Sequence, residues 1–370
     1  MNVPVLRFPE FRDAVEWKIK PFDKLFTIGN GRDYKHLPTG EVPVYGSGGY
    51  MLSVNDYLYD GESVCIGRKG TINNPMFLTG KFWTVDTLFY THSFKDCSPK
   101  FIYLIFQNIN WLSHNEAGGV PSLSKANISK IEVAVPEQDE QQKIAACLSS
   151  LDELITAQAQ KLEAIKTHKK GLMQQLFPAE GETVPKLRFP EFRDAGEWEE
   201  KYLENVAPLQ RGFDLPSDQI KPGTIPVVYS NGVQNFHNIG MAKAPGLVTG
   251  RSGTIGKIHF IENGDYWPHN TSLWVTSFKG NHPKFIYFLY ISIGINQFAS
   301  GSGVPTLNRN YVHAFKVRIP PTLPEQQKIA VCLSSVDELI TAQSQKVEAL
   351  LTHKKGLMQQ LFPAVDEVNA

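Results

Sequence analysis

Two segments of this 370-residue chain each occur twice, and this repetition constrains the fold more than any other feature of the sequence. The first segment, Val3–Trp17, returns as Val184–Trp198 with 13 of 15 residues identical. The second segment, Lys143–Ala179, returns as Lys328–Ala364 with 31 of 37 residues identical. Because a repeat of this kind reflects repeated structure, we expect two equivalent halves related by a pseudo-twofold axis.

The stretches between the repeated segments have diverged and share only short motifs. These motifs are Ile66–Ile72 with Thr249–Ile255, Lys100–Tyr103 with Lys284–Tyr287, and Gly119–Leu123 with Gly303–Leu307. Near-identity of the repeated segments indicates that each performs the same task twice, such as binding two copies of one partner. Divergence on a shared framework indicates that the two intervening domains recognise different things. A recent duplication without functional asymmetry is the alternative interpretation.

Both copies of the second segment are predicted to form a long helix. Apolar residues recur alternately four and three positions apart, so that eight of ten seam positions in each copy are apolar. Prolines, which cannot sit inside a helix, stand before and after each copy. At roughly 40 residues, each helix would span about 60 Å. We expect the two helices to pack as an antiparallel coiled coil, with the register set by polar seam residues, namely Gln158, Lys169, Gln343 and Lys354.

Each intervening domain is predicted to be strand-rich with mixed α/β character, which makes the fold class α+β. The expected strands are Val42–Tyr45, Ser63–Ile66, Thr87–Thr91 and Ile131–Val135, and in the second half Ile225–Tyr229, Lys257–Ile261, Ser272–Thr276 and Phe315–Ile319. One helix is expected in each domain, at Lys100–Asn108 and Lys284–Ser292. The predicted domains are a first recognition domain at 1–136, a first spacer helix at 137–178, a second recognition domain at 179–319, a second spacer helix at 320–363 and a tail at 364–370.

The loops of both intervening domains gather polar and aromatic residues suited to nucleic acid. Arg and Asn side chains can make two-point hydrogen bonds with guanine and adenine edges, whereas Lys and Ser bind phosphates. The chain has zero net charge, which argues against tight DNA binding without partners, but residues 201–319 carry 11 basic and 5 acidic residues. The predicted DNA contacts are Tyr45, Ser47, Tyr50, Arg68, Lys69, Lys81, Trp83, Lys125, Asn127, Tyr229, Asn231, Gln234, Arg251, Ser252, His269, Asn270, Asn308, Arg309 and Asn310. The alternative for each residue alone is a solvated loop side chain.

A second apolar stripe on the long helices lies outside the seam. It consists of Leu154, Met173 and Phe177, with the equivalents Leu339, Met358 and Phe362. One interpretation is a docking surface for a partner protein, used twice. The other interpretation is packing against the globular domains of the chain itself.

No catalytic, metal or cofactor site is predicted. The segment Thr249–Lys257 resembles a phosphate-binding loop, but five residues separate its glycines where four are needed, and Ile258 replaces the hydroxyl residue that would bind magnesium. We interpret this segment as a structural turn. The four cysteines are scattered, and no stretch approaches the roughly 20 apolar residues of a membrane span, so we expect a cytoplasmic protein.

The order of the segments and the sequences within them resemble a known family. LRFPEF near the start of each half and KKGLMQQLF at the end of each long helix are similar to the specificity (S) subunit of Type I restriction-modification systems. The resemblance implies two target-recognition domains, each reading one half of a bipartite, asymmetric site in double-stranded DNA. It implies that the long helices dock two methylation subunits, and restriction subunits through them. S-adenosylmethionine, ATP and magnesium would be held by those partners.

Two other classes of function are compatible with the sequence. A nuclease or methyltransferase with a degenerate motif would need clustered carboxylates, and those at residues 137–140 fall on the first turn of a helix, where acids favour the helix dipole. A coiled-coil scaffold that never binds DNA would be indifferent to charge reversal at Arg68, Arg251 and Arg309. We favour a non-catalytic DNA-specificity subunit.

Overall fold

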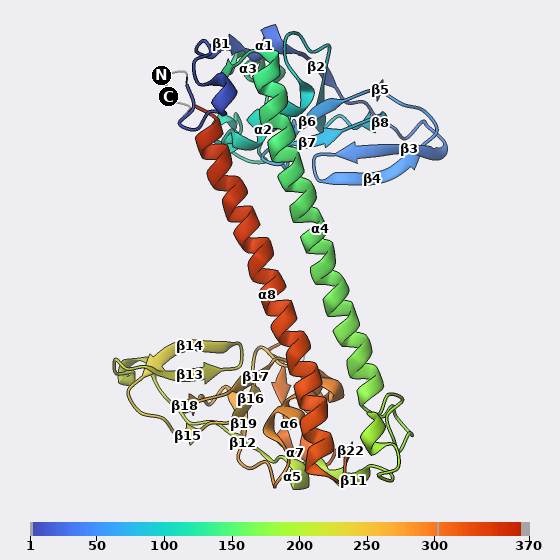
Figure 1. Cartoon of the computed structure of the whole chain (residues 1–370), viewed down its shortest axis with the longest axis vertical. Coiled ribbons are helices and arrows are strands. Elements are labelled where there is room, and N and C mark those ends of the chain that lie inside the picture. Colours follow the sequence, from blue (N-terminus) through green and yellow to red (C-terminus); the bar gives the residue numbers. More distant parts are fainter. Residues whose placement is uncertain (1–2, 302, 364–370) are drawn as a thin grey trace. The chain divides into compact units, whose positions relative to one another are not determined.

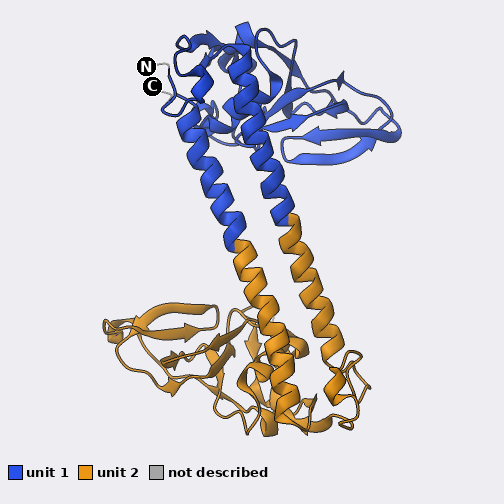
Figure 2. Ribbon diagram, viewed as in Figure 1, with its two compact units in different colours: residues 1–159, 345–370 blue, residues 160–344 orange. Residues whose placement is uncertain are grey.

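The computed structural model describes residues 3–301 and 303–363 of the chain. The chain divides into two compact units (Figure 2). Unit 1 comprises residues 1–159 and 345–370, and unit 2 comprises residues 160–344. Each unit therefore contains one intervening domain together with a segment from each of the two long helices (Figure 1). The predicted tail at 364–370 lies outside the described residues, and the predicted domain boundaries remain a prediction.

The intervening domain of unit 1 contains two four-stranded sheets. The first sheet has the antiparallel order β2 (Thr27–Asn30), β9 (Leu88–His92), β6 (Ser63–Gly67) and β7 (Met76–Leu78). The second sheet has the order β4 (Gly49–Val54), β3 (Thr39–Gly46), β8 (Lys81–Thr84) and β5 (Tyr59–Asp60), in which β3 and β8 run parallel. Strands β1 (Lys18–Pro21) and β10 (Glu132–Val135) form a separate antiparallel pair.

Unit 2 repeats this topology with different side chains. Its first sheet has the order β12 (Leu209–Arg211), β19 (Ser272–Val275), β16 (Gly246–Gly250) and β17 (Ile258–Ile261). Its second sheet has the order β14 (Gly232–His237), β13 (Ile225–Tyr229), β18 (Asp265–Pro268) and β15 (Ala242–Lys243), again with one parallel pair. Two short antiparallel pairs complete it, β11 (Glu199–Tyr202) with β22 (Lys316–Ile319) and β20 (Ala299–Ser300) with β21 (Thr306–Leu307).

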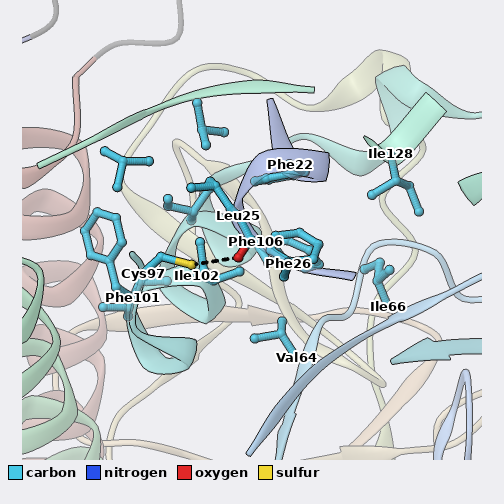
Figure 3. Close-up of a cluster of buried hydrophobic side chains, with 14 of the residues drawn as sticks. Phe22, Leu25, Phe26, Val64, Ile66, Cys97, Phe101, Ile102, Phe106 and Ile128 are labelled. Atoms are coloured by element: carbon cyan, nitrogen blue, oxygen red, sulfur yellow. Dashed lines mark hydrogen bonds between the residues drawn. The ribbon is translucent and has the colours of Figure 1, made fainter. Parts of the chain in front are cut away.

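The main core of each unit lies where the first sheet meets a helix. In unit 1 this helix is α2 (Pro99–Asn108), which packs on β6 and β7 and buries Phe101 and Phe106. The short helix α1 (Phe22–Leu25) closes the same core, and the Cys97 thiol donates a hydrogen bond of 3.2 Å to its last carbonyl (Figure 3). Helices α5 (Leu203–Val206) and α6 (Pro283–Ile293) take the corresponding places in unit 2. The two intervening domains are therefore built on equivalent cores.

The second repeated segment forms the predicted long helices, α4 (Gln138–Leu176) and α8 (Leu323–Leu361), each of 39 residues. In unit 1 the start of α4 and the end of α8 belong to one hydrophobic cluster, whereas in unit 2 the end of α4 and the start of α8 do. The two helix segments within each unit therefore run antiparallel, as predicted. None of the helices in the described part of the chain is long and apolar enough to cross a membrane.

Two equivalent ion pairs join the helix segments within the units. In unit 1, Lys354 Nζ lies 2.7 Å from Asp152 Oδ1, and in unit 2, Lys169 Nζ lies 2.6 Å from Asp337 Oδ1. Both lysines are largely covered, with 14% and 19% of their side chains exposed. These two lysines were predicted to set the register of the helices. The structure shows that each of them pairs with an aspartate of the other long helix.

The first repeated segment is fastened to both long helices. In unit 1, Arg7 pairs with Glu140 in the first turn of α4, and Leu6 N donates a hydrogen bond of 2.9 Å to Gln360 O near the end of α8. In unit 2, Arg188 pairs with Glu325 in the first turn of α8, and an equivalent backbone bond reaches Gln175 near the end of α4. The near-identity of this segment in the two halves therefore follows from one packing arrangement used twice.

All eight predicted strands and both predicted domain helices are present, with small shifts at their ends. Among the described residues the sequence predicted eight of the 22 strands; it did not predict the others, β4 and β14 among them, or the short helices α1, α3 (Lys125–Lys130), α5 and α7 (Arg309–His313). Elements this short carry only a weak periodic pattern, so the sequence identified some of them and missed others.

Candidate DNA-recognition interface

The loop that follows β6 carries Arg68 and Lys69 and is held on both sides by backbone hydrogen bonds. The amides of Arg68 and Lys69 donate to Thr87 O at 2.8 and 3.4 Å, and the Gly70 amide donates to Pro121 O at 2.9 Å. Gly70 has a positive φ of 91°, a conformation that favours glycine. The loop therefore presents two cationic side chains, both exposed, from a fixed backbone.

Unit 2 holds Arg251 and Ser252 in the same way after β16. Their amides donate to Thr271 O at 2.8 and 3.1 Å, and the Gly253 amide donates to Pro305 O at 3.0 Å. Gly253 also has a positive φ, of 86°. Two domains with divergent sequences thus share one backbone frame, on which one has an arginine and a lysine and the other an arginine and a serine.

In unit 1 this loop borders an open groove of about 830 Å³. Arg68 and Lys69 line one part of the groove, and Lys125 at the start of α3 lines another. The Arg68 guanidinium lies 5.9 Å from the Phe89 ring centre. Glu116 also lines the groove, and hydrogen bonding to Ser124 lowers the pKa of its carboxyl. Three cations against one carboxylate leave the groove positively charged, as a DNA-binding surface requires.

The other predicted contacts of unit 1 surround this loop or lie on the second sheet. A methyl group on Gly70 would lie 3.4 Å from Ser47 Oγ, so the turn between β3 and β4 is adjacent to the loop. Tyr45 and Tyr50 pair across that hairpin with ring centres 6.2 Å apart, and Tyr50 is 64% exposed. Asn127 is exposed on α3, and its backbone amide donates a hydrogen bond to the hydroxyl of Ser124, which caps this helix. Lys81 is the first residue of β8, and its Nζ lies 4.8 Å from the centre of the Tyr57 ring.

Trp83 is not available to DNA, and its prediction as a contact is wrong for this structure. Its side chain is 6% exposed and belongs to the core of the second sheet with Val44 and Val54. Its indole Nε1 donates a hydrogen bond of 2.9 Å to Arg32 O. The reason is the position of β8, which has neighbours on both sides and buries three of its four residues.

In unit 2 the structure brings four predicted residues into one cluster. The rings of Tyr229 and His269 lie 4.0 Å apart at an angle of 32°, and burial lowers the pKa of His269. Arg251 donates a hydrogen bond of 3.3 Å to the carbonyl of Asn270. The side-chain amide of Asn270 also donates a hydrogen bond to the Asp214 carboxylate. The sequence did not indicate this acidic neighbour, because it lies 56 positions away.

The remaining predicted residues of unit 2 are exposed. Asn231 lies in the turn between β13 and β14, and Gln234 lies on β14. Asn308 caps α7, because its side-chain Oδ1 accepts a hydrogen bond of 3.0 Å from the backbone amide of Asn310. Arg309 therefore lies on the first turn of this helix. The Leu307 amide donates to Arg251 O at 2.8 Å, so this group adjoins the Arg251 loop.

The second apolar stripe divides into an exposed and a buried part. Leu154 and Leu339 are 43% and 58% exposed and remain candidates for a partner. Phe177 and Phe362 are buried, and each stacks on a phenylalanine of its own unit, Phe285 at 5.6 Å and Phe101 at 5.5 Å. Met173 and Met358 pack against the same clusters. For Phe177 and Phe362 the docking prediction is wrong, because they belong to the cores of the units, whereas the two methionines are partly buried and their role in docking stays a prediction.

The sequence also did not identify the protruding loops around Val120 and Val304 as part of the surface, although the repeated motif Gly-Val-Pro marked them. Val120 lines the unit 1 groove and is 56% exposed. Within residues 3–301 and 303–363, no group of three or more His, Cys, Asp or Glu side chains is placed to hold a metal ion.

Comparisons with known proteins give the family of the chain. The family model for the Type I restriction modification DNA specificity domain matches twice, at residues 14–167 and 195–351. The MjaVIII specificity subunit of Methanocaldococcus jannaschii is 24% identical, with 84% of this chain and 79% of that protein covered. The EcoDI specificity subunit of Escherichia coli is 21% identical, with 96% and 86% covered.

Solved structures agree in fold. The S subunit of a Type I restriction-modification system from M. genitalium has a TM-score of 0.71 at 16% identity and covers 98% of this chain and 100% of its own. A chain from a structure concerned with complex assembly in the type I R-M system has a TM-score of 0.58 at 12% identity, covering 94% and 98%.

These observations define a class of DNA-recognition proteins that serve a larger assembly. The chain belongs to the family of Type I restriction-modification specificity subunits. It is a DNA-recognition subunit of such a system and not one of its catalytic components.

Proposed function

We propose that the chain reads a bipartite, asymmetric site in double-stranded DNA, with one half-site read by each unit and an unread gap between them. The observation that carries the proposal is the shared frame with different side chains. The same backbone hydrogen bonds hold Arg68 and Lys69 in unit 1 and Arg251 and Ser252 in unit 2. Arginine makes two-point bonds with guanine, lysine favours phosphate or guanine, and serine is less selective. Two such surfaces would prefer different base sequences.

We further propose that two methylation subunits bind one chain through the long helices, with restriction subunits joining through them. The supporting observation is that Leu154 and Leu339 are exposed and yet identical in the two repeats. In the proposal, a partner that binds the same surface twice contacts this leucine at the equivalent position of both helices. S-adenosylmethionine, ATP and magnesium belong to these partners in the proposal.

Methylome sequencing tests the proposal. The chain is expressed together with its methylation subunit, and host DNA is sequenced for modified bases. We expect a methylated two-part motif with a fixed gap. Exchange of residues 201–319 for the corresponding domain of another family member should change one half of the motif only. If an intact complex, verified by native mass spectrometry, leaves DNA unmethylated and unbound, the protein is a scaffold that does not bind DNA.

A further inference from the structure

We infer that Val120 and Val304 contact the sugar walls of the DNA minor groove, one in each half-site, and hold both units on DNA without reading its sequence. The inference rests on the proposed function, because it assumes that both units bind duplex DNA. It adds a contact shared by the two half-sites to the side chains that distinguish them.

In unit 1 Val120 lies on a loop closed at its base. The Glu116 amide donates to Ser122 O at 3.0 Å, and Asn115 Oδ1 accepts hydrogen bonds from the amides of Ala117 and Ser122 at 3.1 and 2.9 Å. A methyl group added to Gly119 would meet no atom within 4 Å. The loop is therefore firmly anchored but open at its tip.

In unit 2 Val304 lies on a loop that is closed at the equivalent positions by different side chains. Ser300 and Thr306 pair as neighbours in β20 and β21, and the Thr306 hydroxyl donates to Ser300 O at 3.3 Å. A methyl group on Gly303 would also meet no atom within 4 Å. The two loops thus close at the same positions with different residues, Glu116 and Ser122 in one and Ser300 and Thr306 in the other, but both present the same Gly-Val-Pro tip, which indicates that the tip itself has a function.

Neither valine has a role in the core. Val120 is 56% exposed and Val304 is 65% exposed, whereas the leucines three positions later, Leu123 and Leu307, are buried at 4% and 3%. A single exposed valine is unremarkable in any protein. The same exposed valine at the same position of two otherwise divergent domains needs a cause. A residue before proline favours extended backbone, but many residue types satisfy that preference.

The charges beside the two tips identify the partner as DNA. Each tip adjoins the loop of Arg68 or Arg251 through an antiparallel bridge, between Lys69 and Ser122 in unit 1 and between Ser252 and Thr306 in unit 2. Each tip is also followed by the first residue of a short helix, Lys125 or Arg309. An apolar tip among cations matches a groove whose walls are sugars and whose edges are phosphates.

The repetition of valine selects the minor groove. The two units differ in the side chains that would read bases, so a contact common to both should involve features common to all DNA. The minor groove offers a degenerate pattern, whereas an apolar contact in the major groove would favour thymine methyl groups. Apolar side chains of architectural proteins use the minor groove in this way.

The test uses the full chain assembled with its methylation subunits and the variants Val120→Ser and Val304→Ser. The control is Val15→Ser, since Val15 is also 65% exposed but corresponds to Gly196 in the repeat. The probes are a duplex carrying the motif found by methylome sequencing and a duplex of scrambled sequence. We expect each test variant to weaken binding about threefold to tenfold on both duplexes, as for the loss of one or two apolar groups from a contact. The control should bind like the parent, and thermal melting should be unchanged for all three.

The inference is overturned if Val120→Ser and Val304→Ser bind DNA as tightly as the control does. It is also overturned if the two variants bind only the motif duplex more weakly and the scrambled duplex as before. If the parent complex binds neither duplex, the proposed function itself fails. If a serine variant unfolds at a lower temperature than the parent, the variant Val304→Cys replaces it, because cysteine is close to valine in size. An iron chelate attached to this cysteine cleaves the DNA strands that lie near the tip. Cleavage of the two strands offset in the 3′ direction places the tip in the minor groove, and a 5′ offset, or no cleavage above that of the parent with its native cysteines, contradicts it.

Discussion

Arg188 binds both carboxylate oxygens of Glu325, with its Nε and Nη2 atoms each 2.8 Å from one of them. The two side chains are 9% and 1% exposed, and the hydrogen bond to Glu325 raises the pKa of Arg188. The Arg7–Glu140 pair repeats this arrangement in unit 1. The arginine of the repeated LRFPEF motif therefore fastens the start of each half to the first turn of a long helix.

Arg188→Ala should destabilise unit 2 severely, because it leaves Glu325 buried without its cation. We expect a loss of about 3–5 kcal/mol in the free energy of unfolding, measured by urea denaturation. Lys328→Ala provides the control, since it breaks a half-exposed pair with Glu191 at 3.1 Å and should cost about 0–1 kcal/mol. Equal losses in the two variants would show that the buried pair contributes no more than a surface pair.

The two equivalent tryptophans should differ in their tolerance of phenylalanine. Trp17 and Trp198 are both buried and pack edge-on against equivalent phenylalanines, but only Trp198 donates a hydrogen bond from Nε1 to Glu325, at 3.1 Å. Among the described residues Trp17 Nε1 has no partner. Trp198→Phe should therefore cost about 1–2 kcal/mol more than Trp17→Phe. Hydrogen exchange that follows each unit separately measures both, and equal costs would contradict the expectation.

Acidification should open unit 2 before unit 1. Burial lowers the pKa values of His259, His269, His282 and His313 in unit 2, and of His92 in unit 1. A folded state with lowered histidine pKa values binds fewer protons than the unfolded chain. Its stability is therefore complete above about pH 6.5, the unfolded value, and falls as the pH drops through the folded values.

Limited proteolysis at pH 7.5 and at lower pH, with the fragments identified by mass, checks the order of opening. His313→Gln serves as a matched variant, because His313 Nε2 accepts a hydrogen bond of 2.8 Å from the Leu209 amide and glutamine can also accept without titrating. We expect this variant to be less sensitive to acid than the parent. Simultaneous cleavage of both units in the parent would contradict the prediction.

Single changes on the long helices should remove one partner at a time. Leu339→Asp places a charge on one of the two exposed leucine positions and should reduce the number of bound methylation subunits from two to one in native mass spectrometry. Leu154→Asp should do the same. Val331→Asp is the control, since Val331 is 65% exposed on α8 but has alanine as its repeat equivalent. Retention of two partners in both leucine variants would exclude these positions from the docking surface.

Arg251→Ala should weaken DNA binding and change its selectivity. If Arg251 binds a base edge, its removal costs about 1–3 kcal/mol and relaxes one position of one half-site, whereas loss of a phosphate contact lowers the salt slope by about one. Lys201→Ala removes an exposed cation on β11 that pairs with Glu199 at 2.6 Å, and should leave binding unchanged. Fluorescence anisotropy over a range of salt concentrations distinguishes the two modes. Equal behaviour of the two variants would remove Arg251 from the interface.

The sequence predicted those features that depend on local periodicity. The four-and-three spacing of apolar residues identified both long helices, and runs of β-branched and aromatic residues identified eight of the 22 strands in the described part of the chain. It did not predict that Trp83 is covered, because the neighbours of β8 come from distant parts of the chain. It assigned Phe177 and Phe362 to a partner for a similar reason, since the rings that cover them lie far away in sequence. The candidate surface was recognised in outline, but its loops are fixed by long-range backbone bonds that no spacing reveals.

Unit 1 combines the first and the last part of the chain, and this affects how it folds during synthesis. Unit 2 is one continuous stretch of chain, whereas the core of unit 1 includes Leu361 and Phe362 beside Trp17 and Phe101. During synthesis the first recognition domain must wait for these late residues, although most of it has long left the ribosome. A prematurely terminated subunit would thus present unit 1 without its complete core. The order of translation therefore makes completion of the first domain depend on completion of the second long helix.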